Sequence, residues 1–338
     1  MSGLNAPGGS VVVLVPQDRC VEFFDAADWA RLVEAARRLG GSLERLDSLD
    51  GVSAADLRVL VTGWGSPTLD AQLLATMPRL GLVAHTGASV RGYVTSEVFA
   101  RGIAVTQAGH AMARPVAEVS LTFTLMLLHR VHRMNHAVHA GAPWYDAELF
   151  GQQHELAATE ILVVGASRTG RAYLAMLRAL GARPLLVDPT LTPEQVRELG
   201  AEAVGLEEGL ARARILALHA PSLPETHHLI GARELALLPD GVGVVNTARS
   251  WLVDEAALLA EVSSGRLDAA IDVFDEEPLP AHSPWRGLPN VVLTPHRAAG
   301  TVEGRLAQGR IVVDEVSAWA RGEVLRHAIS ETAWATMA

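Results

Sequence analysis

Short apolar runs alternate with helical patterns through the first third of the chain. Four runs rich in valine and leucine predict buried strands: SVVVLVP (10–16), LRVLVTGWG (57–65), LGLVAHTG (80–87) and IAVTQAG (103–109). The segment AADWARLVEAARRLG has helical periodicity and ends at Gly40. Strands that alternate with helices favour a parallel sheet covered by helices.

The pattern then changes and starts again. A long helical stretch from Pro115 to Gly141 is followed by a predicted loop, APWYDAELFGQQHE. A second set of strands is predicted at TEILVVG (159–165), RPLLVD (183–188), RILALHA (214–220), GVGVVNT (241–247), LDAAIDVF (267–274) and NVVLTPH (290–296). We expect a final helix, from Val302 to Arg321, to return to the first domain. The predicted domains are 1–112 plus 300–338, and 113–299.

Composition excludes some classes of protein. The 338 residues suffice for two domains with proper cores, and 49% of them are apolar. A net charge of −10 without a basic cluster argues against nucleic acid as a partner. Cys20 is the only cysteine, so no intrachain disulfide can form, and we expect a reducing cytoplasm.

No membrane association is expected. The N-terminal MSGLNAPGGS lacks the basic and apolar regions of a signal peptide. The longest apolar segment, VSLTFTLMLL (119–128), is much shorter than the roughly 20 residues that cross a bilayer. We therefore interpret it as a buried helix.

The stretch EILVVGASRTGRAYLAMLRALG predicts a strand, a tight turn and a helix, the arrangement of a dinucleotide-binding loop. Gly165 and Gly170 occupy the first and third glycine positions, and Ser167 occupies the second. Serine is small, and its hydroxyl could donate to a phosphate oxygen. Asp188 closes the next strand, where an acid accepts from ribose hydroxyls and repels a 2′-phosphate, so NAD is favoured over NADP. The alternatives are a plain strand–helix turn and, for Asp188, a cap or turn residue.

Three later stretches, VVNTARSWLVDE, AAIDVFDEEP and VVLTPHRAAG, follow predicted strands and should face the cofactor crevice. With LHAPSLPETHHLIG and ARPVAE upstream, in this order and at this spacing, the chain resembles the D-2-hydroxyacid dehydrogenase family, which includes phosphoglycerate, formate and phosphite dehydrogenases. The resemblance covers most of 57–325. It implies an α/β fold of two Rossmann- or flavodoxin-like doubly wound parallel-sheet domains, with an NAD-binding cleft between them. Residues 1–112 plus 300–338 would form the substrate-binding (catalytic) domain, and 113–299 the NAD-binding Rossmann domain.

The resemblance also implies roles for individual residues. Arg249 resembles the arginine that grips the substrate carboxylate and carbonyl oxygen, a task that suits a planar guanidinium. His296 resembles the general acid/base, and Glu277 the carboxylate that orients it and stabilises its protonated form. The cofactor-binding residues implied are Gly165, Ser167, Arg168, Thr169, Gly170, Asp188, Pro221, Thr247, Ala248 and Asp272. Taken singly, these residues are typical of surface salt bridges, turns and a solvated acidic loop.

The region matching the family's substrate loop departs from its usual pattern. In HTGASVRGYV, Gly87 is kept, Ser89 replaces a second glycine, and Arg91 stands near the usual acid. The N–H groups of Gly87, Ala88 and Ser89 could still hold a carboxylate. Arg91 would add positive charge or make an outward salt bridge.

In the loop TGWGSP, Trp64 would form either an apolar wall of the substrate site or part of the core. No lysine lies in either loop, which weakens an assignment to phosphite oxidation.

His129, His132, His136 and His139 have spacings that place them on one face of the predicted long helix. Two such pairs could bind zinc in principle, but no carboxylate or cysteine accompanies them, and Arg130 and Arg133 would repel a cation. No metal is therefore predicted. We expect this face to lie in a homodimer interface through the helix near 115–139, as in the family.

The chain is thus predicted to be an NAD-dependent D-2-hydroxyacid dehydrogenase that uses NAD (NADH) and a small anionic substrate. Two alternatives stay open. One is a non-catalytic NAD-sensing binding protein on the same fold, as in the C-terminal-binding-protein corepressors. The other is a dehydrogenase for a related anion, such as a phosphonate.

Overall fold

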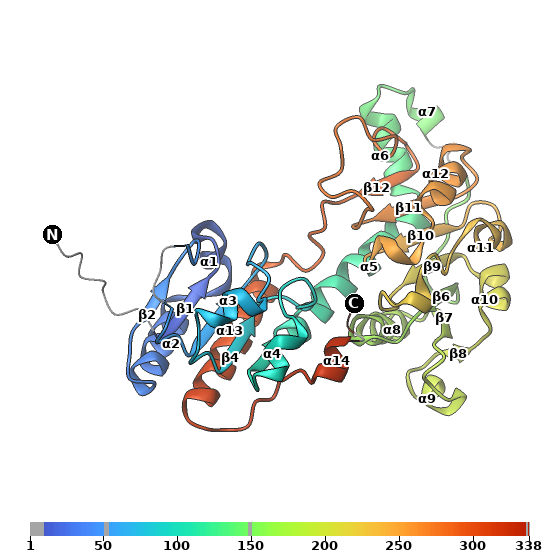
Figure 1. Cartoon of the computed structure of the whole chain (residues 1–338). Helices are drawn as coiled ribbons and strands as arrows, with labels where there is room; N and C mark the ends of the chain where they lie inside the picture. Colours follow the sequence, from blue (N-terminus) through green and yellow to red (C-terminus); the bar gives the residue numbers. More distant parts are fainter. Residues whose placement is uncertain (1–9, 51–53, 148–150, 336, 338) are drawn as a thin grey trace. The chain divides into compact units, whose positions relative to one another are not determined.

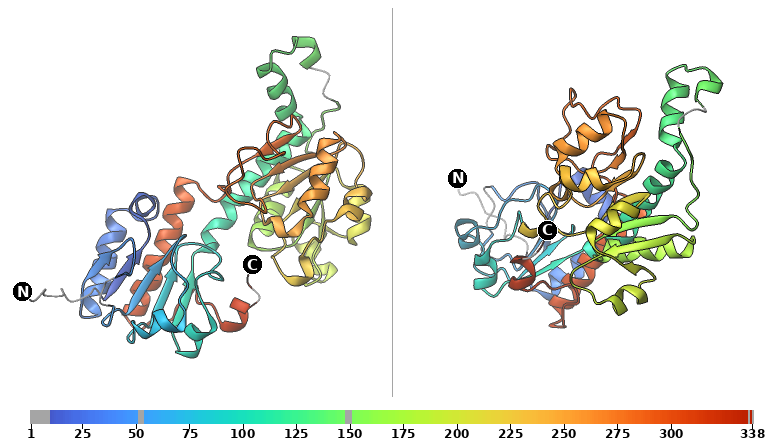
Figure 2. Two further views of the ribbon diagram at one scale, coloured as in Figure 1. Left: turned by 45° about the horizontal axis from the view of Figure 1, so that its top comes forward. Right: turned by 90° about the vertical axis from the view of Figure 1, so that its right-hand side faces the viewer.

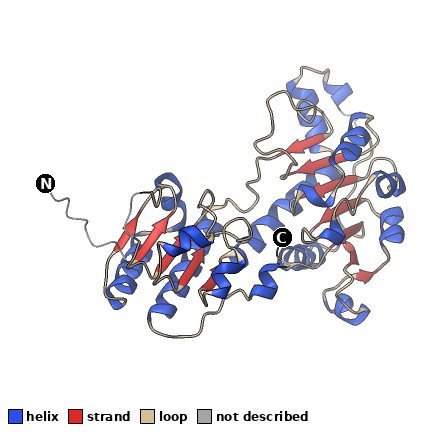
Figure 3. Ribbon diagram, in the orientation of Figure 1, coloured by secondary structure: helices blue, strands red, loops and turns tan. Residues whose placement is uncertain are grey.

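The protein consists of two compact α/β units (Figures 1 and 3). The structure, a computed structural model, describes residues 10–50, 54–147, 151–335 and 337. Unit 1 comprises Met1–Met112 and Gly300–Ala338, and unit 2 comprises Ala113–Ala299. The signal-peptide prediction concerns mainly residues 1–9, which lie outside the described residues, as do 148–150 of the predicted 142–155 loop.

The sheet of unit 1 has five parallel strands in the order β2-β1-β3-β4-β5. They are β1 (Val11–Leu14), β2 (Leu43–Arg45), β3 (Val59–Thr62), β4 (Leu82–His85) and β5 (Ala104–Gln107). The four predicted apolar runs are confirmed as β1, β3, β4 and β5. The edge strand β2 was not predicted, because its three residues are only half-buried and form no apolar run.

Helices cover this sheet, and the last long helix of the chain is one of them. They are α1 (Gln17–Phe23), α2 (Ala26–Arg38), α3 (Ala71–Ala75), α4 (Ser96–Ala100), η1 (Gly109–Met112), α13 (Val302–Ala320) and α14 (Glu331–Ala335). Helix α13 packs against α1, α2 and β4, and both views in Figure 2 show it beside the first strands. A side chain at Gly309 would collide with the carbonyl of Phe23, so this glycine lets α13 approach closely.

The sheet of unit 2 has seven parallel strands in the order β12-β11-β10-β9-β6-β7-β8. They are β6 (Glu160–Val164), β7 (Arg183–Val187), β8 (Glu202–Ala203), β9 (Ile215–Leu218), β10 (Gly243–Asn246), β11 (Asp268–Ile271) and β12 (Val291–Leu293). The strand order reverses between β6 and β9, which marks the crevice where ligands bind in such sheets. All six predicted strands are confirmed, and the exposed two-residue β8 was missed.

Eight α-helices are described in unit 2. They are α5 (Ala113–Leu128), α6 (Val131–His139), α7 (Trp144–Ala147), α8 (Arg168–Ala179), α9 (Pro193–Glu198), α10 (Leu206–Arg212), α11 (Ala232–Leu237) and α12 (Glu255–Ser263), with 3₁₀ turns η2 (Pro224–Thr226) and η3 (Ser250–Leu252). The prediction of a single long helix over 115–141 is wrong, because the helix is interrupted between α5 and α6. The loop predicted over 142–155 is also partly wrong, since α7 lies within it.

The break is centred on Arg130, whose φ of 54° is left-handed. The guanidiniums of Arg130 and Arg133 both pair with Asp268, which is fully buried at the start of β11. This pairing holds the start of α6 against the amino ends of the strands. It also separates His129, which precedes the break, from His132, His136 and His139, whose spacing keeps them on one face of α6. The expectation that all four share one face of a single long helix is therefore wrong for His129.

One helical segment is long and apolar enough to cross a membrane by length and composition alone. It runs over Gly109–Leu128, 20 residues with a mean hydropathy of 1.3. The expectation that this span is far too short is wrong, because the helix begins ten residues before the apolar run. The segment includes α5, which packs against α8 and β10, as expected of a buried helix.

Three histidines lie in the protein interior and are held neutral. Burial lowers the pKa of His85 and His132 to about 4 and that of His219 to about 3, from an ordinary value of 6.5. Neither ring nitrogen of His219 has a hydrogen-bond partner among the described residues, and its ring packs 5.0 Å from the ring of Tyr173. Burial therefore disfavours protonation of each of these three rings in the folded protein.

We expect the free energy of unfolding to fall as the pH drops from about 6.5 towards 4. Below pH 6.5 the unfolded chain binds protons at these histidines, while the folded chain does not until its lower pKa values are reached. Each histidine contributes a slope of up to about 1.4 kcal/mol per pH unit. Urea denaturation at pH 7 and pH 5 measures the loss. His219→Leu should reduce it, whereas the exposed control His282→Leu should not. An equal loss in both variants would contradict the assignment to His219.

Candidate active site

The turn after β6 requires its two glycines for steric reasons. Gly165 has a φ of 96°, and a β-carbon there would lie 2.5 Å from the backbone nitrogen of Ala220, which follows β9. A β-carbon at Gly170 would collide with the carbonyl oxygen of Gly165. The turn is therefore pressed between the carboxyl ends of β6 and β9, at the reversal of strand order. In such a turn, the pyrophosphate of a dinucleotide can approach the backbone closely.

Ser167 fits this turn without strain. Its φ of −58° is ordinary for any residue, and its hydroxyl caps α8 by accepting a 3.3 Å hydrogen bond from the N–H of Gly170. The hydroxyl hydrogen stays available to donate to an anion. Arg168 beside it is exposed and makes no ion pair with any described residue, while Thr169 is half-buried.

Asp188 at the end of β7 is fixed by three hydrogen bonds. Its two oxygens accept from the N–H of Ala166 at 2.7 Å and from the N–H and hydroxyl of Thr190 at 2.9 and 2.6 Å. Burial by itself would raise the pKa of Asp188, but these hydrogen bonds and the charge of Arg171 outweigh it and lower the pKa. The carboxylate therefore stays ionised beside the glycine turn. Its hydrogen bonds to Thr190 show the turn role of Asp188, and its role toward the ribose stays a prediction.

The segment after β10 places Arg249 in a half-buried position. Asn246 accepts from the N–H of Ala248 at 3.1 Å and donates to the carbonyl of Arg249 at 2.9 Å, which shapes the loop. Thr247 is buried, and its hydroxyl lies 2.7 Å from that of Ser120 on α5. Burial lowers the pKa of the Arg249 guanidinium, and the charge of Glu277 opposes this shift.

The buried carboxylate of Asp272, just after β11, holds the segment that follows β12. Its oxygens accept from the hydroxyl of Thr294 at 2.6 Å and from the N–H groups of Arg297 and Ala298 at 3.0 and 2.9 Å. Between these anchors, His296 has a left-handed φ of 50°, which an L-residue rarely adopts. Asp272 thus determines where the imidazole stands.

His296 and Glu277 form a hydrogen-bonded pair. The Nδ1 atom of His296 lies 2.7 Å from one Glu277 oxygen, and the other oxygen accepts from the N–H of Phe274 at 2.9 Å. An ionised carboxylate only accepts, so Nδ1 carries the hydrogen and Nε2 is left for another partner. The pair opens on a cavity of about 590 Å³ within unit 2, whose lining also includes Pro278, Leu279, Arg286, Leu293, Thr294 and Pro295.

The predicted substrate residues lie in unit 1, at the carboxyl ends of β3 and β4. Trp64 is half-buried, as are Ala88 and Ser89, and Gly87 is buried. A β-carbon at Gly87 would lie 2.7 Å from Nε2 of His85, so this glycine is required. Arg91 is exposed and donates to the carbonyl of Met337 at 3.0 Å; none of its contacts in the described chain is a salt bridge.

Within unit 2 the structure brings the predicted residues into three groups, after β6–β7, after β10 and after β11–β12. Pro221 is exposed after β9, where its carbonyl accepts from Thr226 at 2.6 Å. Sequence reasoning missed Thr294 and Ser120, which hold Asp272 and Thr247. Thr294 stands two residues before His296, and that position was the available signal. In the described parts of the chain no three histidine, cysteine or acidic side chains gather as a metal site would require.

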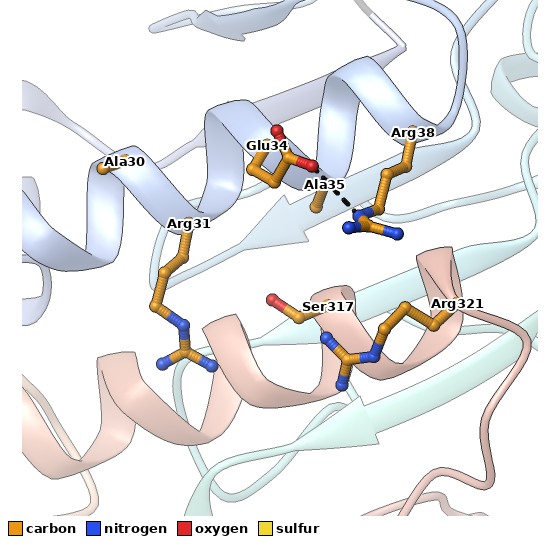
Figure 4. A pocket seen from close by; sticks show the side chains of 7 residues that line it. All are labelled: Ala30, Arg31, Glu34, Ala35, Arg38, Ser317 and Arg321. Atoms are coloured by element: carbon orange, nitrogen blue, oxygen red, sulfur yellow. Dashed lines mark ion pairs between the residues drawn. The ribbon is translucent and has the colours of Figure 1, made fainter.

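A second hollow, of about 290 Å³, lies between α2 and α13 of unit 1 (Figure 4). Its three guanidiniums are engaged: Arg38 with Glu34, Arg31 with Asp314 and Arg321 with Glu323. Both helices end beside it, and helix C-termini carry negative partial charge. The arginines therefore stabilise helix ends, and this hollow is not a candidate active site.

Comparison with known proteins places the chain in a family. Residues 121–298 match the family model described as D-isomer specific 2-hydroxyacid dehydrogenase, NAD binding domain. The D-3-phosphoglycerate dehydrogenase of Mycobacterium leprae is 34% identical over 264 residues, which are 78% of this chain and 49% of that protein. The glyoxylate reductase of Aeropyrum pernix is 33% identical over 263 residues, which are 76% of this chain and 78% of that protein.

A solved structure of a related protein is also similar to this chain. A phosphoglycerate oxidoreductase from Rhizobium etli is 28% identical with a TM-score of 0.74, over 94% of this chain and 97% of that one. The chain spans about half the length of the first curated relatives it matches. The chain belongs to the D-isomer specific 2-hydroxyacid dehydrogenase family, and residues 121–298 are its NAD-binding domain. The resemblance drawn from the sequence is confirmed, as is the α/β fold with two parallel sheets.

We expect NADH to bind more tightly than NADPH, by at least about tenfold, because the ionised carboxylate of Asp188 would repel a 2′-phosphate. Calorimetric titration with each cofactor measures the ratio. Asp188→Ala should narrow the ratio, while Asp240→Ala, which changes an exposed acid of the same unit, should leave it unchanged. Equal or tighter binding of NADPH to the unaltered protein would refute the prediction.

Proposed function

We propose that this chain is an NAD-dependent oxidoreductase that transfers a hydride between nicotinamide and C2 of a small 2-hydroxy or 2-keto acid. The observation that carries the proposal is the His296–Glu277 pair, fixed by Asp272 beside the cavity of unit 2. NADH, when bound, supplies the hydride. The residues of the chain then have to orient the acid and move one proton, since reduction of a ketone adds one hydride and one proton.

His296 suits the proton transfer. Nδ1 of His296 donates a 2.7 Å hydrogen bond to Glu277. The Nε2 atom is therefore the one that exchanges a proton with the substrate oxygen in our proposal. The Glu277 carboxylate balances the charge of the imidazolium that donates during reduction. Glu277 is itself oriented by the N–H of Phe274, so the pair is prearranged before substrate arrives.

Arg249 suits the binding of the acid. Its guanidinium is half-buried, and it makes no ion pair with a described residue; the nearest polar contact is a 2.6 Å hydrogen bond to the carbonyl of Ala248. Four N–H groups stay available for a carboxylate and a carbonyl oxygen. In our proposal, Arg249 pairs with the substrate and polarises its C2 oxygen.

In our proposal, a loop of unit 1 also binds the substrate carboxylate. The successive N–H groups of Gly87, Ala88 and Ser89 donate to no acceptor in the described residues. Consecutive free N–H groups form a concave anion site. We assign the substrate carboxylate to this loop, so that in our proposal unit 1 binds the substrate and unit 2 binds NAD.

A homodimer and a cytoplasmic location belong to the same proposal. Helices α6 and α7 expose large apolar side chains, Val131, Val138, Trp144 and Tyr145, the last two at 71% and 78%. An exposed apolar group of this kind is typical of a subunit interface. Cys20, the only cysteine of the chain, is buried with a free thiol, which suits a reducing compartment.

His296→Ala should lower kcat for keto-acid reduction by about 10²–10⁴-fold, the usual contribution of a general acid, while NADH affinity stays nearly unchanged. Steady-state kinetics on a panel of 2-keto acids and NADH titration measure the two effects. His282→Ala, an exposed histidine of the same unit, is the control and should retain activity. Near-native turnover by His296→Ala would overturn the site. NADH binding without turnover on any acid would favour the NAD-sensing protein.

Light scattering should give about twice the 35.9 kDa mass of one chain at micromolar concentration. Val138→Asp should shift the protein towards the monomer, because it places a charge in the proposed interface. Val324→Asp changes a more exposed valine of unit 1 and should not. A monomer in the unaltered protein, or the same shift in both variants, would remove the basis for this interface.

A further inference from the structure

The loop that carries Glu277 begins at Asp275, after β11, and runs to Trp285, before β12. It contains no helix or strand, and residues 275–278 are exposed. Together with Glu277, Leu279 of this loop lines the cavity of unit 2. Because regular backbone pairing is absent from this loop, side chains from outside it have to fix its position.

Glu255 contacts both ends of this loop. One of its oxygens, Oε2, accepts a 2.7 Å hydrogen bond from the backbone N–H of Asp275. The other, Oε1, accepts a 2.9 Å hydrogen bond from the indole N–H of Trp285. A single carboxylate therefore closes the loop at its base.

The backbone of Glu255 is itself held firmly. Glu255 is the first residue of α12, and Asp254 caps this helix by accepting from the N–H of Ala257 at 3.0 Å. The N–H groups at the start of a helix carry positive partial charge, which favours a carboxylate at this position. Glu255 thus joins the loop to a fixed point of unit 2.

Trp285 anchors the far end of the loop in the core. Its side chain is 1% exposed and belongs to the same buried apolar cluster as Leu258 of α12 and Phe274. The indole N–H only donates, and a buried donor requires an acceptor. Glu255 supplies that acceptor.

The anchored end also holds the residues that follow Glu277. Arg286, next to Trp285, donates to the carbonyl oxygens of Leu279 and Pro280, both at 2.8 Å. The chain on the far side of Glu277 is therefore tied back to the segment that Trp285 fixes.

At the other end, Glu255 and Glu277 bind neighbouring peptide groups. The N–H of Phe274 donates to Glu277 at 2.9 Å, and the next N–H, that of Asp275, donates to Glu255. The second Glu277 oxygen lies 2.7 Å from Nδ1 of His296. A displacement of the Asp275 N–H would therefore also displace the neighbouring N–H that orients Glu277.

We propose that Glu255 is a positioning residue for the acid/base pair: by holding Asp275 and Trp285 together, it keeps Glu277 against His296. This inference rests on the proposed function. Both partners of Glu255 are donors, so both of its oxygens have to accept, as an ionised carboxylate does and an amide does not. Glu255→Gln would place an NH₂ group against one of the two donors.

Glu255→Gln should lower kcat for keto-acid reduction by roughly tenfold, a part of the 10²–10⁴-fold that a general acid contributes. The NADH affinity should change by less than about twofold, because Glu255 acts on the loop of Glu277 and not on the cofactor turn. NADH titration counts the binding sites, and kcat is expressed per site, so a loss of folded protein does not change it. Glu261→Gln, the control, alters another half-buried carboxylate of α12, which pairs with Arg266 at 2.6 Å, and should leave kcat unchanged.

A double-mutant cycle distinguishes positioning from a general loss of structure. In a Glu277→Gln background, Glu255→Gln should change kcat by less than about twofold, because residues that act as a unit have non-additive effects. Trp285→Phe removes the indole N–H and keeps an aromatic ring. It should give a smaller loss with the same dependence on Glu277, and it serves as the second variant if Glu255→Gln does not fold. Amide hydrogen exchange at Asp275 should be faster in Glu255→Gln than in the unaltered protein.

Two results would overturn the inference: an unchanged kcat in Glu255→Gln, or an equal loss of kcat with Glu277 present and with Glu277→Gln. Unchanged exchange at Asp275 would overturn it too. Absence of turnover with every 2-keto acid, together with faster exchange at Asp275, would instead overturn the proposed function while confirming that Glu255 holds the loop.

Discussion

The arrangement of the proposed acid/base pair depends on one buried carboxylate. Asp272 accepts three hydrogen bonds from the segment after β12, at 2.6, 2.9 and 3.0 Å. These bonds oppose the strain of the left-handed backbone at His296, which costs about 1–3 kcal/mol in a residue other than glycine. Asp272 follows β11, which is paired on both sides, by β10 and β12, so the sheet holds the carboxylate in place. The imidazole is thereby positioned for its Nδ1 to contact Glu277.

The turn after β6 is positioned by the same sheet, here through steric exclusion. There the close approach of β6 and β9 leaves no room for a β-carbon at Gly165, so steric exclusion sets the path of the backbone. Ser167 is accepted because its φ is negative and its hydroxyl replaces part of the missing helix-end hydrogen bonding. A glycine is thus required only where φ or distance demands it, and the departure from the usual pattern at Ser167 adds no strain.

The sequence predicted the features that are encoded locally. Apolar runs predicted ten of the twelve described strands, and the resemblance to the family, carried by the stretches around Arg249, Glu277 and His296, implied the roles of these residues. The edge strands β2 and β8 escaped notice because their side chains are half-buried or exposed. The helix break at Arg130 escaped because its partner Asp268 is far along the chain. The anchoring role of Asp272 escaped because two of its three donors are backbone N–H groups, which every residue except proline carries.

The charge distribution supports the part that Arg249 plays in our proposal. Several other buried or half-buried arginines have carboxylate partners: Arg130 and Arg133 share Asp268, and Arg305 lies near Glu22. Arg249 has none within ion-pair distance in the described chain, and Glu277 acts on it only from farther away. Burial lowers the pKa of the Arg249 guanidinium, and an anion placed beside it would favour its charged form. The fold thus keeps Arg249 unpaired beside the acid/base pair, and binding of a carboxylate would complete the electrostatics of the site.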